Sequence, residues 1–166
     1  FFQAEDGIRR CSRDWSSDVC SSDLAGTLSD LFLSVAAMRE MEQGRLAPGD
    51  DVSKPLGEQT PRGITVGQVL THQAGDARLL AELVAKTSGM PAPNNIAANI
   101  FQPLLMTGSR ADDMGIRTSA SDIAHLMIAL VNGGTYETRP LLQPATVDTM
   151  ERTQFTRHAA LAGWTY

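Results

Sequence analysis

The chain has 166 residues, a length that fits one ordinary domain with a hydrophobic core of its own. Its formal net charge of −5 argues against nucleic-acid binding, which needs a concentrated basic face, and leaves small molecules and proteins as partners. No apolar run approaches the roughly 20 residues that cross a membrane, so we expect no membrane span.

The first 24 residues differ from the rest because they lack helical or strand periodicity and are rich in Ser and Asp. They resemble the translation of a common sequencing adapter, which residues 3–9 (QAEDGIR) and 14–24 (DWSSDVCSSDL) match, although Arg10 departs from it. We therefore predict that residues 1–24 are an artefact and not a domain, with a natural disordered tail as the alternative. The remaining residues, 25–166, hold 14 acidic and 11 basic side chains, a net charge of −3.

Both cysteines, Cys11 and Cys20, lie in this adapter-like segment. Cysteine content therefore says nothing about the redox compartment. We expect the biological N-terminus to be missing, so the lack of a signal peptide leaves the localisation unknown.

The patterned part of the chain opens with a predicted helix over residues 28–43. Its apolar side chains recur every three or four residues and form one stripe, with Leu31, Phe32, Val35 and Met38. Ser29 or Asp30 is expected to cap its start, and Gly44 suits the left-handed turn at its end. Residues 45–62 form a polar connection with apolar anchors at Leu46, Val52 and Leu56.

Five shorter segments have helical spacing together with cap or stop residues. Thr65 is expected to cap the first, and Gly89 to terminate the second, which covers residues 79–87. The third is expected to be capped by Asn94 or Asn95 and stopped by Pro103. The fourth is expected to be capped by Ser119 or Ser121 and to run to Val131, and the last is expected to start at Pro144. Only residues 163–166 suggest a strand, so the body is predicted to be mostly helical.

Four stretches occur in a specific order: MEQGRLAPGDDVSKPL (41–56), ITVGQVLTHQAG (64–75), LLAELVAKTSGMPAPNNIAANIFQPLLMT (79–107) and MGIRTSASDIAHLMIALVNGG (114–134). Each alone is weak, but the ordered set resembles the penicillin-recognising, β-lactamase-related serine hydrolases, which include class C β-lactamases, D,D-peptidases and related esterases. The resemblance covers most of residues 25–166.

The resemblance implies a fold. In intact relatives, an antiparallel sheet flanked by helices meets a mostly helical region at the active site. We expect this chain to be mostly α: the helical region of the β-lactamase/D,D-peptidase-like α+β fold, with most of the antiparallel sheet missing. Relative to that family, sequence is expected to be missing between Gly75 and Asp76 and between Asp113 and Met114.

The resemblance also implies a chemistry. Relatives carry S-x-x-K at a helix start, a spacing that puts both side chains on one face and lets the Lys amine accept the Ser proton. A tyrosine of Y-x-N assists proton transfer, and a K-T-G or H-x-G strand binds substrate beside the oxyanion hole. Intact relatives act on small-molecule or peptidoglycan-like substrates, and they are commonly periplasmic or secreted bacterial proteins.

In this chain the catalytic motifs are absent. Counting back from Gly44, the family register places the nucleophile at Thr27 and the lysine at Asp30. Aspartate is a poor replacement base, because its reference pKa is about 3.9 against about 10.4 for lysine. The only lysines, Lys54 and Lys86, do not complete S-x-x-K.

The two tyrosines, Tyr136 and Tyr166, do not form Y-x-N. Residues 86–89 (KTSG) resemble K-T-G but contain an extra residue and lie at a predicted helix end.

Other chemistries lack support in the sequence. Neither the G-x-S-x-G, H-E-x-x-H and G-x-G-x-x-G motifs nor a P-loop occur, and His72, His125 and His158 lack ligand spacing, so we expect no cofactor and no metal. His72 is interpreted as an ordinary helix end, with catalysis as the alternative, and His125 as lying on the polar side of its helix. Ser29 and Ser34 are interpreted as helix caps or surface positions.

The sequence therefore predicts a degenerate fragment of a β-lactamase-related serine hydrolase that is inactive because S-x-x-K, Y-x-N and K-T-G are absent. The alternatives are a non-catalytic helical protein-interaction module and an active esterase with an unrecognised base. The ancestral substrate (β-lactam, peptide or ester) and any partner protein are unknown.

Overall fold

The computed structural model describes residues 25–57, 60, 62–112 and 115–152, without the side chains of residues 25–28. Within these residues the chain is mostly helical, as predicted, and two short hairpins are its only sheets. Residues 1–24 lie outside the described part, as do residues 163–166, the expected strand stub. None of the described helices is long and apolar enough to cross a membrane.

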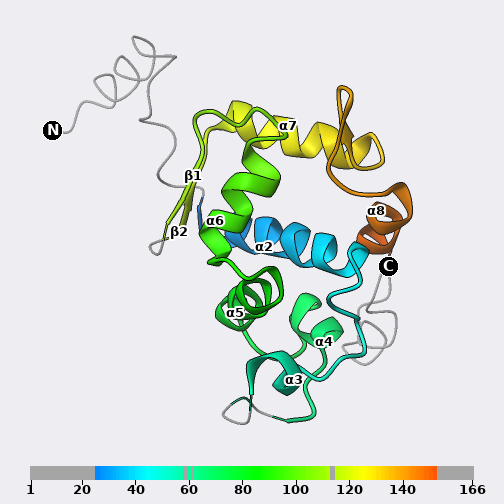
Figure 1. The fold of residues 1–166 in the computed structure, drawn as a ribbon. Helices are drawn as coiled ribbons and strands as arrows, with labels where there is room; N and C mark the ends of the chain where they lie inside the picture. Colours follow the sequence, from blue (N-terminus) through cyan, green and yellow to red (C-terminus); the bar gives the residue numbers. More distant parts are fainter. Residues whose placement is uncertain (1–24, 58–59, 61, 113–114, 153–166) are drawn as a thin grey trace, which may run out of the picture.

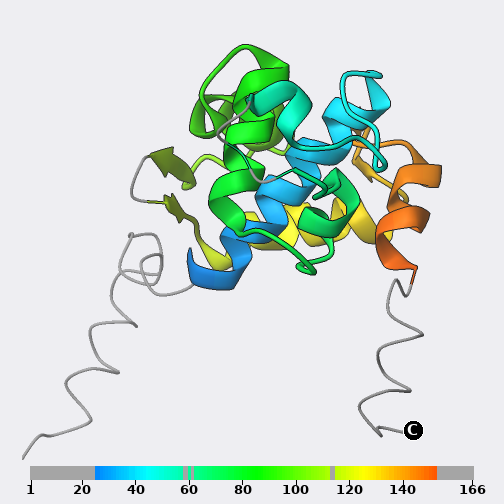
Figure 2. The same cartoon turned by 90° about the horizontal axis from the view of Figure 1, so that it is seen from below.

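Helix α2, Ala25–Glu42, runs through the middle of the molecule in the view of Figure 1. On one side of it lies α7 (Ala120–Val131), and on the other lie α3 (Ser53–Leu56), α4 (Val66–Leu70) and α5 (Ala77–Ser88). Figure 2 shows the same central helix from below. Its buried side chains form the centre of the hydrophobic core, and Phe32 and Val35 are fully buried. The Phe32 ring packs edge to face against the Phe101 ring, with 5.4 Å between the ring centroids. The predicted apolar stripe therefore packs inward, as amphipathic helices do.

The expected caps of α2 are wrong. The helix begins at Ala25, so Ser29 and Asp30 lie inside it and are half-buried. A capping side chain needs the extended backbone of the residue that precedes the first turn, which neither residue has. At the other end Gly44 has φ +71°, so the predicted left-handed turn is confirmed.

The loop after α2 carries a one-turn helix, α3 (Ser53–Leu56), that the Pro and Gly content did not indicate. Helix α4 (Val66–Leu70) is capped by Thr65, as predicted, and the cap is reciprocal: Thr65 Oγ1 accepts from the Gln68 N–H at 3.2 Å, and Gln68 Oε1 accepts from the Thr65 N–H at 2.9 Å. This capping box satisfies two backbone donors of a very short helix.

Helix α5 spans Ala77–Ser88 and ends at Gly89, as predicted. Its cap is Asp76, whose carboxylate accepts from the Leu79 N–H at 3.0 Å. Helix α7, Ala120–Val131, is capped by Ser119, and α8, Pro144–Glu151, begins at the predicted proline.

The expected Asn94 or Asn95 cap is wrong. Helix α6, Ala92–Ile96, begins directly after Pro91 and continues into a π-helical turn, η2, Ala97–Phe101. Pro93 lies in the first turn, where proline loses no helical hydrogen bond. Asn95 is consequently inside the helix, where it is buried.

Two antiparallel hairpins were not predicted. Strand β1 (Arg110–Asp112) pairs with β2 (Gly115–Arg117), and β3 (Thr135–Tyr136) pairs with β4 (Arg139–Pro140). Strands of two or three residues are too short to show the alternation by which strands are recognised in a sequence.

Candidate functional site

One face of α2 carries the two positions that the sequence assigned to catalysis, Thr27 and Asp30, and also Ser34, which the sequence did not assign to it. Thr27, Asp30 and Ser34 follow a three-to-four spacing, and Leu31, Met38 and Met41 continue the same stripe toward the end of the helix. Thr27 is placed by its backbone alone, and Asp30 is half-buried. The two positions that were predicted as nucleophile and base, 27 and 30, therefore share a helix face.

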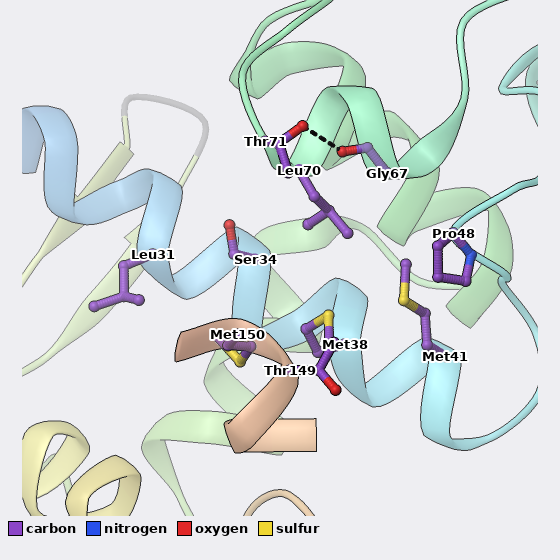
Figure 3. A pocket seen from close by; sticks show the side chains of 10 residues that line it. All are labelled: Leu31, Ser34, Met38, Met41, Pro48, Gly67, Leu70, Thr71, Thr149 and Met150. Carbon is purple, nitrogen blue, oxygen red and sulfur yellow. Dashed lines mark hydrogen bonds between the residues drawn. The ribbon is translucent and has the colours of Figure 1, made fainter. Parts of the chain in front are cut away.

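This face of α2 borders an apolar groove of about 290 Å³ (Figure 3). Its walls come from three helices and one loop: Leu31, Ser34, Met38 and Met41 of α2, Gly67, Leu70 and Thr71 at α4, Thr149 and Met150 of α8, and Pro48. The Ser34 side chain points across the groove toward α4. Of the described residues that line the groove, none is titratable.

Two hydrogen bonds hold α8 in place as a groove wall. The Arg39 Nη1–H donates to the Leu141 carbonyl oxygen at 2.6 Å, and the Gln143 N–H donates to Glu42 Oε1 at 2.6 Å. Burial lowers the pKa of the Arg39 guanidinium from its ordinary value, and the carboxylates of Glu42 and Glu40 offset part of that effect. The last turn of α2 is thus hydrogen-bonded to the segment that leads into α8.

The α4 wall is fixed by a close backbone approach. The Gly67 N–H donates to the Pro48 carbonyl oxygen at 2.8 Å, and a Cβ at Gly67 would lie 3.1 Å from that oxygen. The Val66 N–H donates to the Asp50 carbonyl oxygen at 2.9 Å. These contacts tie the start of α4 to the loop that follows α2.

The lysines are engaged elsewhere or exposed. Lys54 Nζ forms an ion pair with Asp50 Oδ1 at 3.1 Å, and this contact lowers the pKa of the Asp50 carboxyl, together with a hydrogen bond from the Ala47 N–H. Lys86 is exposed in the last turn of α5. Neither lysine is among the side chains that line the groove.

The KTSG stretch lies at a helix end, as predicted. Residues 86–88 complete α5, and Gly89 has the left-handed φ of +73° that ends it. The Thr87 hydroxyl donates to the Leu83 carbonyl oxygen at 2.9 Å. This stretch therefore does not supply an extended substrate-binding edge.

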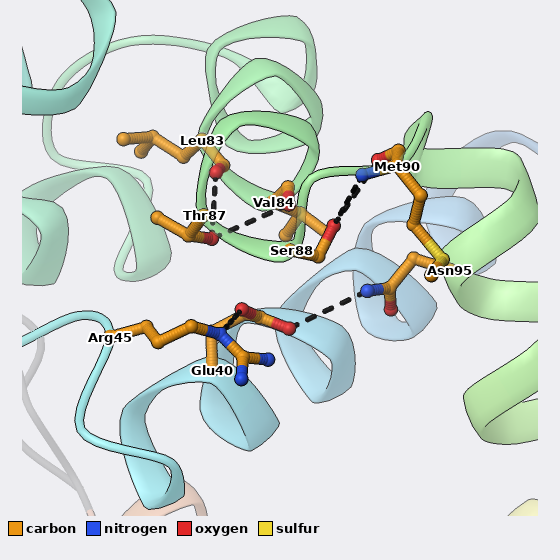
Figure 4. A network of polar contacts seen from close by, with 8 residues as sticks. All are labelled: Glu40, Arg45, Leu83, Val84, Thr87, Ser88, Met90 and Asn95. Atoms are coloured by element: carbon orange, nitrogen blue, oxygen red, sulfur yellow. Dashed lines mark hydrogen bonds and ion pairs between the residues drawn. The ribbon is translucent and has the colours of Figure 1, made fainter.

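The opposite face of α2 carries a buried carboxylate, which Figure 4 shows between two partners. Glu40 is 2% exposed and accepts from Arg45 Nε at 2.5 Å and from Asn95 Nδ2 at 3.5 Å. The bond to Glu40 raises the pKa of the Arg45 guanidinium. Because the charge is paired and hydrogen-bonded, we interpret this network as structural.

Two interpretations of single residues are wrong. Ser34 is neither a cap nor a surface position, because it is half-buried in the groove wall. His125 does not lie on a solvated face: its Nδ1 is 2.9 Å from the Leu104 carbonyl oxygen, and its ring stacks on Tyr136 at 4.7 Å between centroids.

His72 is exposed with φ +53°, and its backbone N–H donates to the Val69 carbonyl oxygen at 3.1 Å, which fits a helix end. His158 lies outside the described residues. Among the residues that are described, no group of three or more His, Cys, Asp or Glu side chains is placed to hold a metal ion.

Solved structures with the same fold are penicillin-binding proteins and a β-lactamase-like protein. The octameric penicillin-binding protein homologue from Pyrococcus abyssi matches with a TM-score of 0.61 and 16% identity, over 78% of this chain and 48% of that one. The "putative beta-lactamase" from Bacteroides dorei DSM 17855 matches with a TM-score of 0.61 and 16% identity, over 81% and 58%. The penicillin binding protein from Bacillus halodurans matches with a TM-score of 0.54 and 15% identity, over 72% and 60%.

No protein-family model and no curated protein matches the chain. The chain spans between about half and three fifths of the length of these three solved structures. At such low identities the likeness shows the fold alone. The chain has the mostly helical part of the fold shared by β-lactamases and penicillin-binding proteins.

Proposed function

We propose that the chain is a degenerate remnant of a β-lactamase-related serine hydrolase that no longer forms an acyl-enzyme. Residues 25–166 are the partial domain, and residues 1–24 are an adapter-like artefact. Two independent observations support this origin: the ordered sequence stretches of the family and the likeness of the fold to penicillin-binding proteins. The ancestral reaction was acyl transfer to a serine hydroxyl from a β-lactam, peptide or ester.

The observation that carries the loss of activity is the pair of residue types at positions 27 and 30, which share one face of α2. Thr27 stands at the nucleophile position and Asp30 at the position of the lysine base. A hydroxyl attacks a carbonyl readily only when a neighbouring group takes its proton. A carboxylate at this point also places negative charge near the oxyanion that would develop on the substrate.

Among the described residues that line the groove on this side of α2, none offers a substitute base. The Thr71 hydroxyl donates to the Gly67 carbonyl oxygen at 2.7 Å, and the Thr149 hydroxyl donates to the Ala145 carbonyl oxygen at 2.8 Å. Ser34 points toward α4, and the other groove-lining side chains of α2 (Leu31, Met38 and Met41) are apolar. An esterase that uses an unrecognised base in this groove is therefore disfavoured.

Hydrolysis of a p-nitrophenyl ester tests the proposal. We expect the purified chain to release p-nitrophenol at the rate of buffer containing an unreactive protein, with or without the substitution Thr27→Ala. The matched control is Thr60→Ala, a threonine that lies far along the chain and outside the groove lining. Turnover that Thr27→Ala abolishes and Thr60→Ala preserves would falsify the proposal.

A second function, binding of a partner without turnover, is favoured by one observation on α7. This helix exposes three apolar side chains at helical spacing, and Val131 and Ile128 are 83% and 45% exposed, with Met127 beside them. Sedimentation velocity over a hundredfold range of protein concentration tests whether this face associates. A single monomeric species throughout argues against self-association through α7.

A further inference from the structure

The hairpin β3–β4 carries an arginine whose charge the described part of the chain does not satisfy. Arg139 is half-buried, and its Nη1 is buried without a hydrogen-bond partner. Among the described side chains, this is the only buried nitrogen or oxygen left in that state. Buried polar atoms are nearly always hydrogen-bonded, and a charged group without a partner costs more than a neutral one. We therefore expect an acceptor from outside the described chain at this nitrogen.

Arg139 projects beside an aromatic pair. It is the cross-strand partner of Tyr136, and directly opposed residues of an antiparallel pair share one face, with Cβ atoms about 5 Å apart. The Tyr136 ring stacks on His125 of α7, and His125 Nδ1 lies 2.9 Å from the Leu104 carbonyl oxygen. Figure 1 shows this hairpin, in the gold part of the chain, folding back beside the end of α7. The hairpin face next to Arg139 is therefore held against the helix.

The base of the hairpin is also fixed. The Gly134 carbonyl oxygen accepts from the Leu141 N–H at 2.8 Å and from the Leu142 N–H at 3.1 Å. A Cβ at Gly134, which has φ +90°, would collide with the Leu142 carbonyl oxygen. The backbone of β4 is thus held at the residues that follow it, so an acceptor has to come to the guanidinium.

The charge at this point indicates the class of ligand. A guanidinium is a permanent cation whose planar N–H groups match the two oxygens of a carboxylate. Within the hairpin, residues 135–140, there is no second basic side chain, and Glu137 in the exposed turn adds a negative charge. A singly charged carboxylate therefore fits the hairpin better than a doubly charged phosphate, which would need a second cation.

We propose that Arg139 holds a small monocarboxylate, whose two oxygens accept from Nη1 and from one other N–H of the same guanidinium. Bidentate binding of this kind gives the buried nitrogen its partner and neutralises the charge. The site is separate from the groove beside α2, because neither Arg139 nor Tyr136 lines that groove. The inference goes beyond the proposed function and does not depend on it.

An NMR titration of the full chain with sodium acetate tests the proposal, with sodium chloride and sodium phosphate as comparisons at the same pH and ionic strength. We expect acetate to cause saturable shifts of the Arg139 Nε–H and of the Tyr136 backbone amide, and chloride to cause none. Shifts that do not saturate, or that chloride reproduces, would overturn the proposal and leave water as the partner of Nη1. Binding of phosphate as tight as that of acetate would overturn the choice of a monocarboxylate.

Two arginine variants locate the site. Arg139→Gln removes the guanidinium and is expected to abolish the saturable shift of the Tyr136 amide. The matched control is Arg110→Gln, because Arg110 is also the first residue of a short hairpin strand but is exposed. This variant is expected to keep the acetate Kd of the parent chain. Equal loss of binding in both variants would place the acetate elsewhere and contradict the proposal.

Urea denaturation gives a readout that survives a change in stability. A ligand that binds only the folded chain raises the folding equilibrium constant about elevenfold at ten times its Kd. We expect acetate to raise the urea midpoint of the parent chain and of Arg110→Gln, but not that of Arg139→Met. In chloride alone, Arg139→Met should be at least as stable as the parent, because an apolar side chain replaces a cation without a partner. A lower midpoint of Arg139→Met in chloride would show that the guanidinium already has a partner in the chain.

Discussion

The Arg39 guanidinium on α2 donates a 2.6 Å hydrogen bond to the backbone carbonyl oxygen of Leu141, which lies 102 residues further along the chain. This bond joins the last turn of the central helix to the segment that leads into α8. Leu141 is itself buried, so the carbonyl has little access to water as an alternative partner. The position of α8, and with it one wall of the groove, depends on this contact.

Removal of the Arg39 side chain should therefore loosen α8. We expect Arg39→Ala to lower the free energy of unfolding by about 1–3 kcal/mol, because a buried carbonyl loses its charged donor. Urea denaturation followed by circular dichroism measures the change. The control is Arg78→Ala, an exposed arginine of α5, which should change stability by less than about 0.5 kcal/mol. Equal effects of the two substitutions would show that the Leu141 contact contributes nothing.

The cap of α7 provides a second test with a matched pair of serines. The Ser119 hydroxyl accepts from the Asp122 N–H at 3.1 Å, whereas Ser121 is exposed inside the helix. We expect Ser119→Ala to cost about 0.5–2 kcal/mol of stability. Ser121→Ala should cost less than about 0.5 kcal/mol, since alanine is the better helix former. The reverse order in thermal or urea denaturation would place the cap at Ser121.

The loop between α2 and α4 should lose stability in acid because of Asp51. The Ser53 hydroxyl at 2.6 Å, followed by the backbone N–H groups of Ser53 and Gly63, holds the pKa of the Asp51 carboxyl below its ordinary value of 3.8. A carboxyl whose pKa is lower in the folded state stabilises the fold above its unfolded pKa. That contribution is lost as the pH falls through the folded value.

We therefore expect the contribution of Asp51 to stability to be fully present above about pH 5 and to be lost as the pH falls below about pH 4. Asp51→Asn should flatten part of this fall, because the amide does not titrate. Urea denaturation at pH 7, 5, 4 and 3 measures it. A parent and a variant with the same acid dependence would mean that Asp51 is not linked to folding.

Local chemistry explains why much of the fold could be predicted. Thr65, Ser119, Gly44 and Gly89 act through hydrogen bonds or dihedral angles within a few residues of themselves, so their roles are visible in the sequence. Asp76 does the same at α5, but its neighbours Gly75 and Ala77 gave no clear periodicity at which to place the helix start.

Tertiary contacts explain the errors. Asn95 looks like a cap by residue type, yet it is buried because Glu40, 55 residues earlier, accepts its side-chain N–H. His125 looks solvated by its position on α7, but Tyr136 and the Leu104 carbonyl oxygen surround it from other elements. Partners so distant in sequence leave no local pattern.

The candidate site was predicted only in part. The register counted back from Gly44 places Thr27 and Asp30 on one face of α2, which follows from helical spacing alone. The groove was not anticipated, because it depends on how α4 and α8 are placed beside Ser34 and Met38. Spacing along one helix cannot reveal which other helices stand opposite it.

Covalent labelling tests the central claim most directly. The purified chain is incubated with a fluorescent penicillin and, separately, with a fluorophosphonate, and its intact mass is then measured. We predict an unchanged mass with both reagents, because no amine stands at the Asp30 position to take a proton from Thr27. A stoichiometric adduct that peptide mapping assigns to Thr27 or Ser29, and that disappears on substitution of that residue by alanine, would contradict it.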